Sequence, residues 1–207
     1  MTNPFLPLLK EDQQKAIFQT LLILLLFTII IVAVKRESFM VLFFSYLASI
    51  LYIDSLLKRI ALKQKMLMVL PANSSQLVQA VFTNMFRYIG CLKVGIIPFY
   101  ILIALVEETK SSTGEYVVLY VLMMCITFLA SAVFVWLYFT LKHRPWLTLL
   151  QYVSLLLITI ISFNISFVFE TLAVPIVVQL LFFLVVYGAA IYVLYSRSLK
   201  DYRNFNL

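Results

Sequence analysis

The sequence predicts an all-α membrane protein with six transmembrane helices in one domain, 1–207. Hydrophobic residues make up 64% of the chain and charged residues only 12%, with a mean hydropathy of +1.04, far outside the range of soluble domains. Apolar runs of about 20 residues match the thickness of a bilayer core. A backbone in lipid must satisfy its own hydrogen bonds, as helices and closed barrels do. The runs are too long for barrel strands and lack period-2 alternation, so we expect helices.

The chain begins with a polar segment over 1–16. Lys10, Glu11 and Asp12 stand among leucines there, and this mild amphipathicity predicts a helix at the membrane interface. A first span follows over 17–34. An uncleaved span is favoured over a signal peptide because the apolar run leads directly into basic residues, without a small-residue cleavage site.

The remaining apolar runs predict five further spans. They cover 39–57, 88–106, 116–141, 146–167 and 175–195. With six spans, both termini lie on the same side of the membrane.

The distribution of Lys and Arg places that side in the cytoplasm of a multi-pass protein of the cell membrane. Positive charge concentrates in cytoplasmic segments, and eleven of the 16 basic residues would be cytoplasmic. These are Lys10, Lys15, Lys58, Arg59, Lys63, Lys65, Lys142, Arg144, Arg197, Lys200 and Arg203. The outer pair Lys35-Arg36 runs against the rule but is outnumbered. The net charge of +7 follows from this bias rather than from nucleic-acid binding.

The stretch over 66–86 is the longest part of the chain that does not look built to cross a membrane. Leu70-Pro71 interrupts it, and Asn73, Ser74 and Ser75 can cap a new helix. Apolar positions then form one helical stripe: Leu77, Val78, Val81, Phe82, Met85 and Phe86. On this pattern alone the helix either rests on lipid headgroups or docks into a groove of a soluble partner.

The order of features over 54–88 resembles the small ATP-binding-cassette (ABC) exporter permeases of the type-2 permease superfamily. Asp54 ends the second span, Lys58 opens a basic segment, and Leu70-Pro71, a polar cap and a Val-bearing helix lead into the third span. In that family this segment bears a cytoplasmic coupling helix that contacts the nucleotide-binding subunit. The resemblance implies these contact residues: Asn73, Ser74, Ser75, Gln76, Leu77, Val78, Val81 and Phe82. The chain departs from the family in lacking a basic residue directly after the cap.

The resemblance also implies partners and a bacterial origin. The chain has no GxxxxGK[ST] phosphate loop and only four glycines, so ATP and Mg would be bound by a separate soluble ABC ATPase in two copies. Six helices are half of such a transporter, so a second permease half, identical or homologous, would complete it. Family members often have short re-entrant helices between the fifth and sixth spans.

Few polar residues within the spans are candidates for substrate binding or gating. Lys93 either snorkels to the inner headgroups or contacts a substrate or ion. Asn164 either makes helix–helix hydrogen bonds or contributes to a binding site, and Glu170 is either a solvated outer charge or part of a gate. Asp54 either caps the interface or pairs with Lys58.

No residues indicate a catalytic centre or a metal site. No carboxylate pair and no Ser/His/Asp set converges, His143 is the only histidine, and Cys91 and Cys125 lack CxxC spacing. We therefore expect the permease subunit of an exporter that moves a hydrophobic or amphipathic peptide, lipid or drug. The alternatives are a non-transporting membrane assembly or regulatory protein, and a secondary transporter. The scarcity of intramembrane acids argues against proton or sodium coupling.

Overall fold

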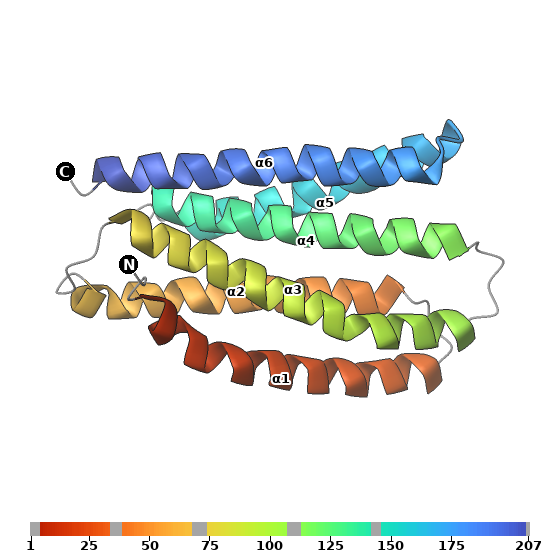
Figure 1. The fold of residues 1–207 in the computed structure, drawn as a ribbon, viewed down its shortest axis with the longest axis horizontal. Coiled ribbons are helices and arrows are strands. Elements are labelled where there is room, and N and C mark those ends of the chain that lie inside the picture. Colours follow the sequence, from red (N-terminus) through yellow and green to blue (C-terminus); the bar gives the residue numbers. More distant parts are fainter. Residues whose placement is uncertain (1–4, 34–38, 68–73, 107–112, 142–145, 206–207) are drawn as a thin grey trace.

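The computed structural model describes residues 5–33, 39–67, 74–106, 113–141 and 146–205. This part of the chain forms six helices: α1 Phe5–Ala33, α2 Phe39–Leu67, α3 Ser74–Val106, α4 Thr113–Leu141, α5 Leu147–Thr171 and α6 Ile176–Phe205. Consecutive helices run in opposite directions, so α1, α3 and α5 begin at the end of the bundle where α2, α4 and α6 finish (Figure 1). We call this the basic end, because Lys58, Arg59, Arg197 and Lys200 lie toward it.

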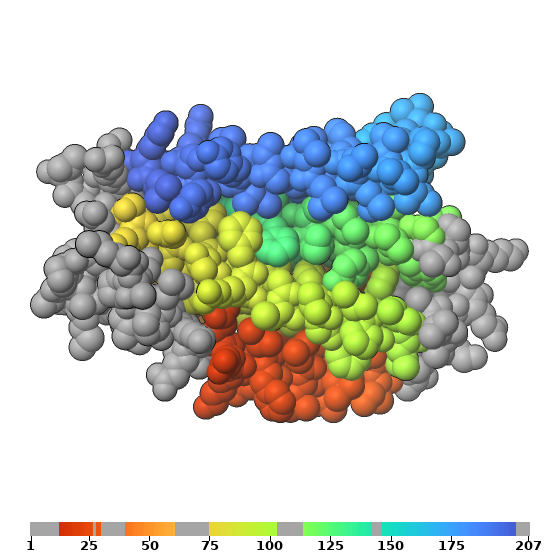
Figure 2. All heavy atoms as spheres, viewed as in Figure 1, coloured from red at the N-terminus to blue at the C-terminus, as the bar shows by residue number. Residues whose placement is uncertain are grey.

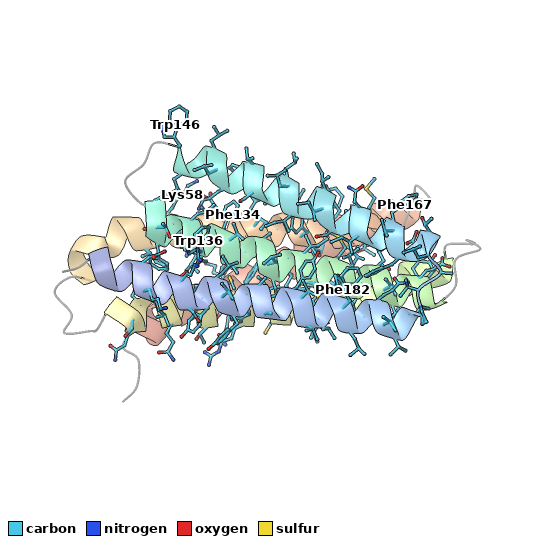
Figure 3. The ribbon with its side chains drawn as sticks, turned by 90° about the horizontal axis from the view of Figure 1, so that it is seen from above. Lys58, Phe134, Trp136, Trp146, Phe167 and Phe182 are labelled. Carbon is cyan, nitrogen blue, oxygen red and sulfur yellow. The ribbon has the colours of Figure 1, made fainter. Side chains whose placement is uncertain are left out.

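Helix α4 is the centre of the bundle. It packs against α2, α3, α5 and α6, whereas α1 packs against α2 and α3. Figure 2 shows α3 crossing one face of the molecule from beside α6 to beside α1, and Figure 3 shows α4 between α5 and α6. In the apolar span of α4, 56% of the residues are buried, against 11% in that of α5. Helix α5 is therefore peripheral and presents most of its apolar surface to its surroundings.

Hydrogen bonds between helices fix α5 to this bundle. The hydroxyls of Tyr46 in α2 and Thr159 in α5 are 3.0 Å apart, and the hydroxyl of Tyr187 in α6 donates to that of Ser162 in α5. Apolar burial gives little driving force between helices in lipid, so polar contacts of this kind contribute to their association.

Five helices of the described chain are long and apolar enough to cross a bilayer. The candidate spans are Met40–Ile60, Ser75–Leu102, Gly114–Leu141, Leu147–Thr171 and Ile176–Asp201. Helix α1 contributes a shorter apolar segment, Gln13–Leu26, among its described residues. The predicted all-helical architecture is thus confirmed, and the sixth span stays a prediction.

Several helices extend further toward the basic end than the apolar runs predict. Helix α2 continues to Leu67, and α3 begins at Ser74. The segments expected to form separate interfacial and coupling helices are the first turns of α1 and α3, each continuous with the helix that follows. The reason is that Lys, Arg, Gln and Leu are good helix formers, so a helix does not stop where its apolar run stops.

The connection between α5 and α6 is a tight turn over 172–175, in place of the re-entrant helices that the family resemblance implies. The N–H of Val174 donates to the carbonyl of Phe169, and that of Ala173 to the carbonyl of Glu170, both at 3.0 Å. This pattern is a Schellman motif, which requires a left-handed residue and usually uses glycine. Here Ala173 takes that position with φ 49°.

Candidate functional site

The first turns of α3 hold most of the residues expected to contact an ATPase. Asn73 lies outside the described residues, and Ser74 is the first residue of the helix. Ser75 is exposed and Gln76 is partly exposed. Both lie at the basic end.

The apolar stripe of this segment is largely buried inside the bundle, and Phe86 is its exposed member at 38%. Leu77, Val78, Val81 and Phe82 are between 0% and 7% exposed, and the ring of Phe82 packs edge-on against Tyr195 of α6 with centroids 5.1 Å apart. These four side chains therefore do not form a surface that a partner can reach in this conformation. The sequence pattern was interpreted as a face for lipid headgroups or for a soluble partner, but in this structure these four residues belong to the core of the chain itself.

The surface of α3 near the basic end is instead a polar strip of four residues, Ser75, Gln79, Thr83 and Arg87. Their spacing of four places them on one face of the helix. Ser75, Gln79 and Arg87 are exposed, and Thr83 is partly exposed. The spacing of these four polar residues is a sequence signal for an exposed helical face.

We call the last turns of α2, 61–67, and the first turns of α3, 74–87, the α2–α3 junction. The apolar span of α2 ends at Ile60, but the helix continues to Leu67, which adds about 10 Å at 1.5 Å per residue. Just before this extension, the ammonium of Lys58 pairs with the carboxylate of Asp54 at 2.6 Å. The predicted pairing of Asp54 with Lys58 is confirmed. The side chain of Lys58 is exposed and that of Asp54 is partly buried.

Lys93 is buried in the middle of the bundle, with only 1% of its surface exposed. Its ammonium donates to the hydroxyl of Ser45 in α2 at 2.8 Å, and that hydroxyl donates in turn to the carbonyl of Leu42 at 2.7 Å. The backbone carbonyl of Lys93 accepts from the hydroxyl of Tyr120 in α4 at 2.8 Å. Lys93 is therefore anchored by α2 and α4 and does not snorkel.

Its hydrogen bond inside the bundle explains why Lys93 does not snorkel. Lys93 lies six residues beyond Arg87, the last residue of the polar strip, or roughly 9 Å along the axis of α3 at 1.5 Å per residue, but its ammonium is buried and bonded to Ser45 of α2. Burying an ammonium costs several kcal/mol unless it is paired or hydrogen-bonded. Among the described residues no carboxylate pairs with it, and Ser45 is its recorded acceptor.

The other two candidates from the spans lie elsewhere. Asn164 is exposed on α5, and its amide donates to the carbonyl of Ile160 at 2.7 Å. Glu170 lines a pocket of about 650 Å³ at the end opposite the basic end, together with Glu115 and Gln179. Lys93 is buried, Asn164 is exposed and Glu170 lines the pocket at the opposite end, so the structure does not bring the three together.

The described residues contain no group of three or more His, Cys, Asp or Glu arranged to hold a metal ion. No family model matches the chain, and neither a curated protein nor a solved structure matches it.

Proposed function

We propose that this chain is the permease subunit of an ATP-driven ABC exporter. The observation that supports the proposal is the α2–α3 junction at the basic end. Helix α2 extends past its apolar span, its extension carries Lys63 and Lys65, and α3 begins at the same end of the bundle with the polar strip (Figure 1). This is the segment whose order of residues resembles the coupling region of the type-2 permeases.

In this proposal the polar strip of α3, rather than the buried stripe, meets the ATPase. Nucleotide binding would close two ATPase subunits and move the α2–α3 junction. Helix α3 is continuous from Ser74 to Val106, so a displacement of its first turns would reach Lys93 and its bond to Ser45. Nucleotide and substrate would then set the populations of inward-facing and outward-facing states through their different affinities for the two.

The substrate class follows from the chemistry of the surfaces. Exposed side chains on α5 and α6 are mainly leucine, isoleucine, valine and phenylalanine, which suits a hydrophobic or amphipathic molecule that approaches from the membrane. A second permease half, identical or homologous, would complete the pathway.

Reconstitution with a soluble ABC ATPase tests the proposal. The purified chain should bind the ATPase and change its rate of ATP hydrolysis. Gln79→Trp, in the polar strip, should weaken both effects, whereas Gln14→Trp, an exposed glutamine on α1 near the same end, should leave them unchanged. Absence of ATPase binding, or equal behaviour of the two variants, would reject the proposal.

A non-transporting assembly or regulatory protein is the second candidate. The burial of Leu77, Val78, Val81 and Phe82 favours it, because the segment that looked like a docking helix is part of the core. This candidate predicts that the chain co-purifies with another integral membrane protein and that ATP has no effect on their association.

A further inference from the structure

Helix α5 carries an exposed amide within the depth of the membrane. Asn164 is exposed and lies five residues from the middle of the span Leu147–Thr171, about 7.5 Å along the axis at 1.5 Å per residue. The hydrocarbon core of a bilayer extends roughly 15 Å on each side of its centre. With the span centred in the bilayer, Asn164 therefore faces outward at a depth where lipid tails surround the helix.

The amide is at the centre of the exposed face of α5. Leu157, Ile160 and Val168 share that face at spacings of seven, four and four residues from Asn164, and each is 49% or 50% exposed. Ser162, on the opposite side of the helix, is buried and accepts a hydrogen bond from α6. The orientation of α5 that buries this serine thus points Asn164 away from its own chain.

The hydrogen-bonding capacity of the Asn164 amide exceeds what its own helix provides. Such an amide has two N–H donors and an oxygen that can accept two hydrogen bonds. In the described structure its recorded hydrogen bond runs from the side-chain nitrogen to the carbonyl of Ile160, one turn earlier, at 2.7 Å. Leaving polar groups unpaired in hydrocarbon is unfavourable, so a polar partner at the same depth would stabilise Asn164.

A second copy of the chain supplies a partner with matching chemistry at that depth. An amide is both donor and acceptor, so it can pair with an identical amide, which an ammonium or a carboxylate cannot do. Two copies inserted in the same direction can be related by a twofold axis along the membrane normal, and residues near that axis meet their own counterparts. The asparagine of one copy would then lie level with the asparagine of the other.

We propose that the chain forms a homodimer in the membrane, in which the α5 helices of two copies pack in parallel and their Asn164 amides hydrogen-bond to each other. Leu157, Ile160 and Val168 pack around this pair and exclude lipid from it. Apolar side chains alone would not favour a protein neighbour over lipid tails, so the asparagine is what distinguishes this face. A single asparagine in an apolar helical seam also fixes register and the number of helices that associate.

The homodimer goes beyond the proposed exporter function, because it names an identical chain as the partner and α5 as the contact. It needs no ATPase. Self-association of the chain alone can therefore fail while ATPase binding succeeds, or the reverse.

Energy transfer between two pools of the full chain, labelled with donor and acceptor fluorophores and mixed in lipid vesicles, tests the dimer. The wild type should self-associate, and Asn164→Leu should weaken the dimer about threefold to thirtyfold, the range for hydrogen bonds between transmembrane helices. Asn164→Gln, which keeps an amide, should retain most of the association. Gln19→Leu, which removes an exposed amide from α1, should leave it unchanged. A monomeric wild type, or equal association in Asn164→Leu and the wild type, would overturn the proposal.

Cysteine cross-linking in the same vesicles tests the face. In a Cys91→Ser background, which removes the exposed native thiol, Ile160→Cys should form a disulfide-linked dimer on mild oxidation. Val186→Cys on α6 is the matched control, because it is 44% exposed and, like Ile160, thirteen positions from Ala173 in the α5–α6 turn. It should stay monomeric on denaturing gels. Equal cross-linking at both positions, or none at Ile160→Cys, would reject α5 as the contact.

Discussion

The ammonium of Lys93 in α3 donates a 2.8 Å hydrogen bond to the hydroxyl of Ser45 in α2, with both residues at most 1% exposed. A lysine in this environment lowers the free energy of unfolding, because its charge is removed from water and is compensated by one neutral hydrogen-bond acceptor. Intramembrane charges of this kind usually mark function.

Replacing the lysine tests whether it is retained for function. Lys93→Met keeps the volume and removes the charge, so it should raise the free energy of unfolding by about 1–4 kcal/mol, as replacement of buried ionic groups does. Stability is measured by denaturant titration in mixed micelles. Transport should fall in the same variant if Lys93 acts in the proposed cycle. If the Lys93→Met variant is less stable than the wild type, the claim that the buried ammonium lowers the free energy of unfolding is wrong.

Removing the acceptor should have the opposite effect on stability. Ser45→Ala leaves the Lys93 ammonium without its recorded partner and should cost about 1–3 kcal/mol of unfolding free energy. In the Lys93→Met background the same substitution should cost much less, because there is no ammonium to satisfy. A double-mutant cycle with no coupling between the two positions would show that the bond contributes nothing.

Two neighbouring residues on α3 should differ strongly in their tolerance of an acidic substitution. Val78→Asp places a carboxylate where the wild-type side chain is 0% exposed and should cost at least about 4 kcal/mol or prevent folding. Gln79→Asp, one residue further and exposed, should change the free energy of unfolding by about 0.5 kcal/mol or less. Equal tolerance of both would mean that the apolar stripe is on the surface.

The α5–α6 turn should be stabilised by glycine. Ala173 has a left-handed φ of 49°, which costs a residue with a Cβ roughly 1–2 kcal/mol. Ala173→Gly should therefore raise the free energy of unfolding by about 1 kcal/mol. Ala189→Gly, exposed in the interior of α6, is the matched control and should lower it by a similar amount. If the two substitutions change the free energy of unfolding in the same direction, Ala173 does not occupy the left-handed position of a Schellman motif.

Two glycines of α3 provide a test of the α1–α3 contact. A Cβ on Gly90 would meet nothing within 4 Å, so Gly90→Ala should stabilise the helix by about 0.5–1 kcal/mol. A Cβ on Gly95 would come within 2.9 Å of Leu21 on α1, so Gly95→Ala should gain less or lose stability. Adding Leu21→Ala should remove that difference, because it removes the clashing atoms. Unfolding titrations of the four variants check the pattern.

The sequence predicts the helices better at one end of the bundle than at the other. The predicted and observed ends coincide at Val106 in α3 and lie within a few residues of each other at the start of α4. At the basic end α2 and α6 continue through lysines and arginines to Leu67 and Phe205. Apolarity defines where a chain can cross lipid, but helix formation does not require it.

The site was less predictable because it depends on packing between helices distant in sequence. Asp54 and Lys58 are four residues apart, and their pairing is a local property that the spacing predicts. The partner of Lys93 is Ser45 on another helix, and no pattern in either segment indicates that they meet. Likewise, the stripe at Leu77 and Val78 predicts a buried face without saying what buries it.

The peripheral position of α5 has a consequence for the response of the protein to its membrane. Helices α2, α3 and α4 each pack against several other helices, whereas α5 contacts the bundle chiefly through α4 and has 11% of its span buried. Helices adapt to a thinner or thicker bilayer by tilting, and the helix with the fewest protein contacts tilts most easily. Changes in acyl-chain length should therefore change the tilt of α5 relative to the other helices. Such a change of tilt would lengthen or break the Tyr46–Thr159 hydrogen bond between α2 and α5.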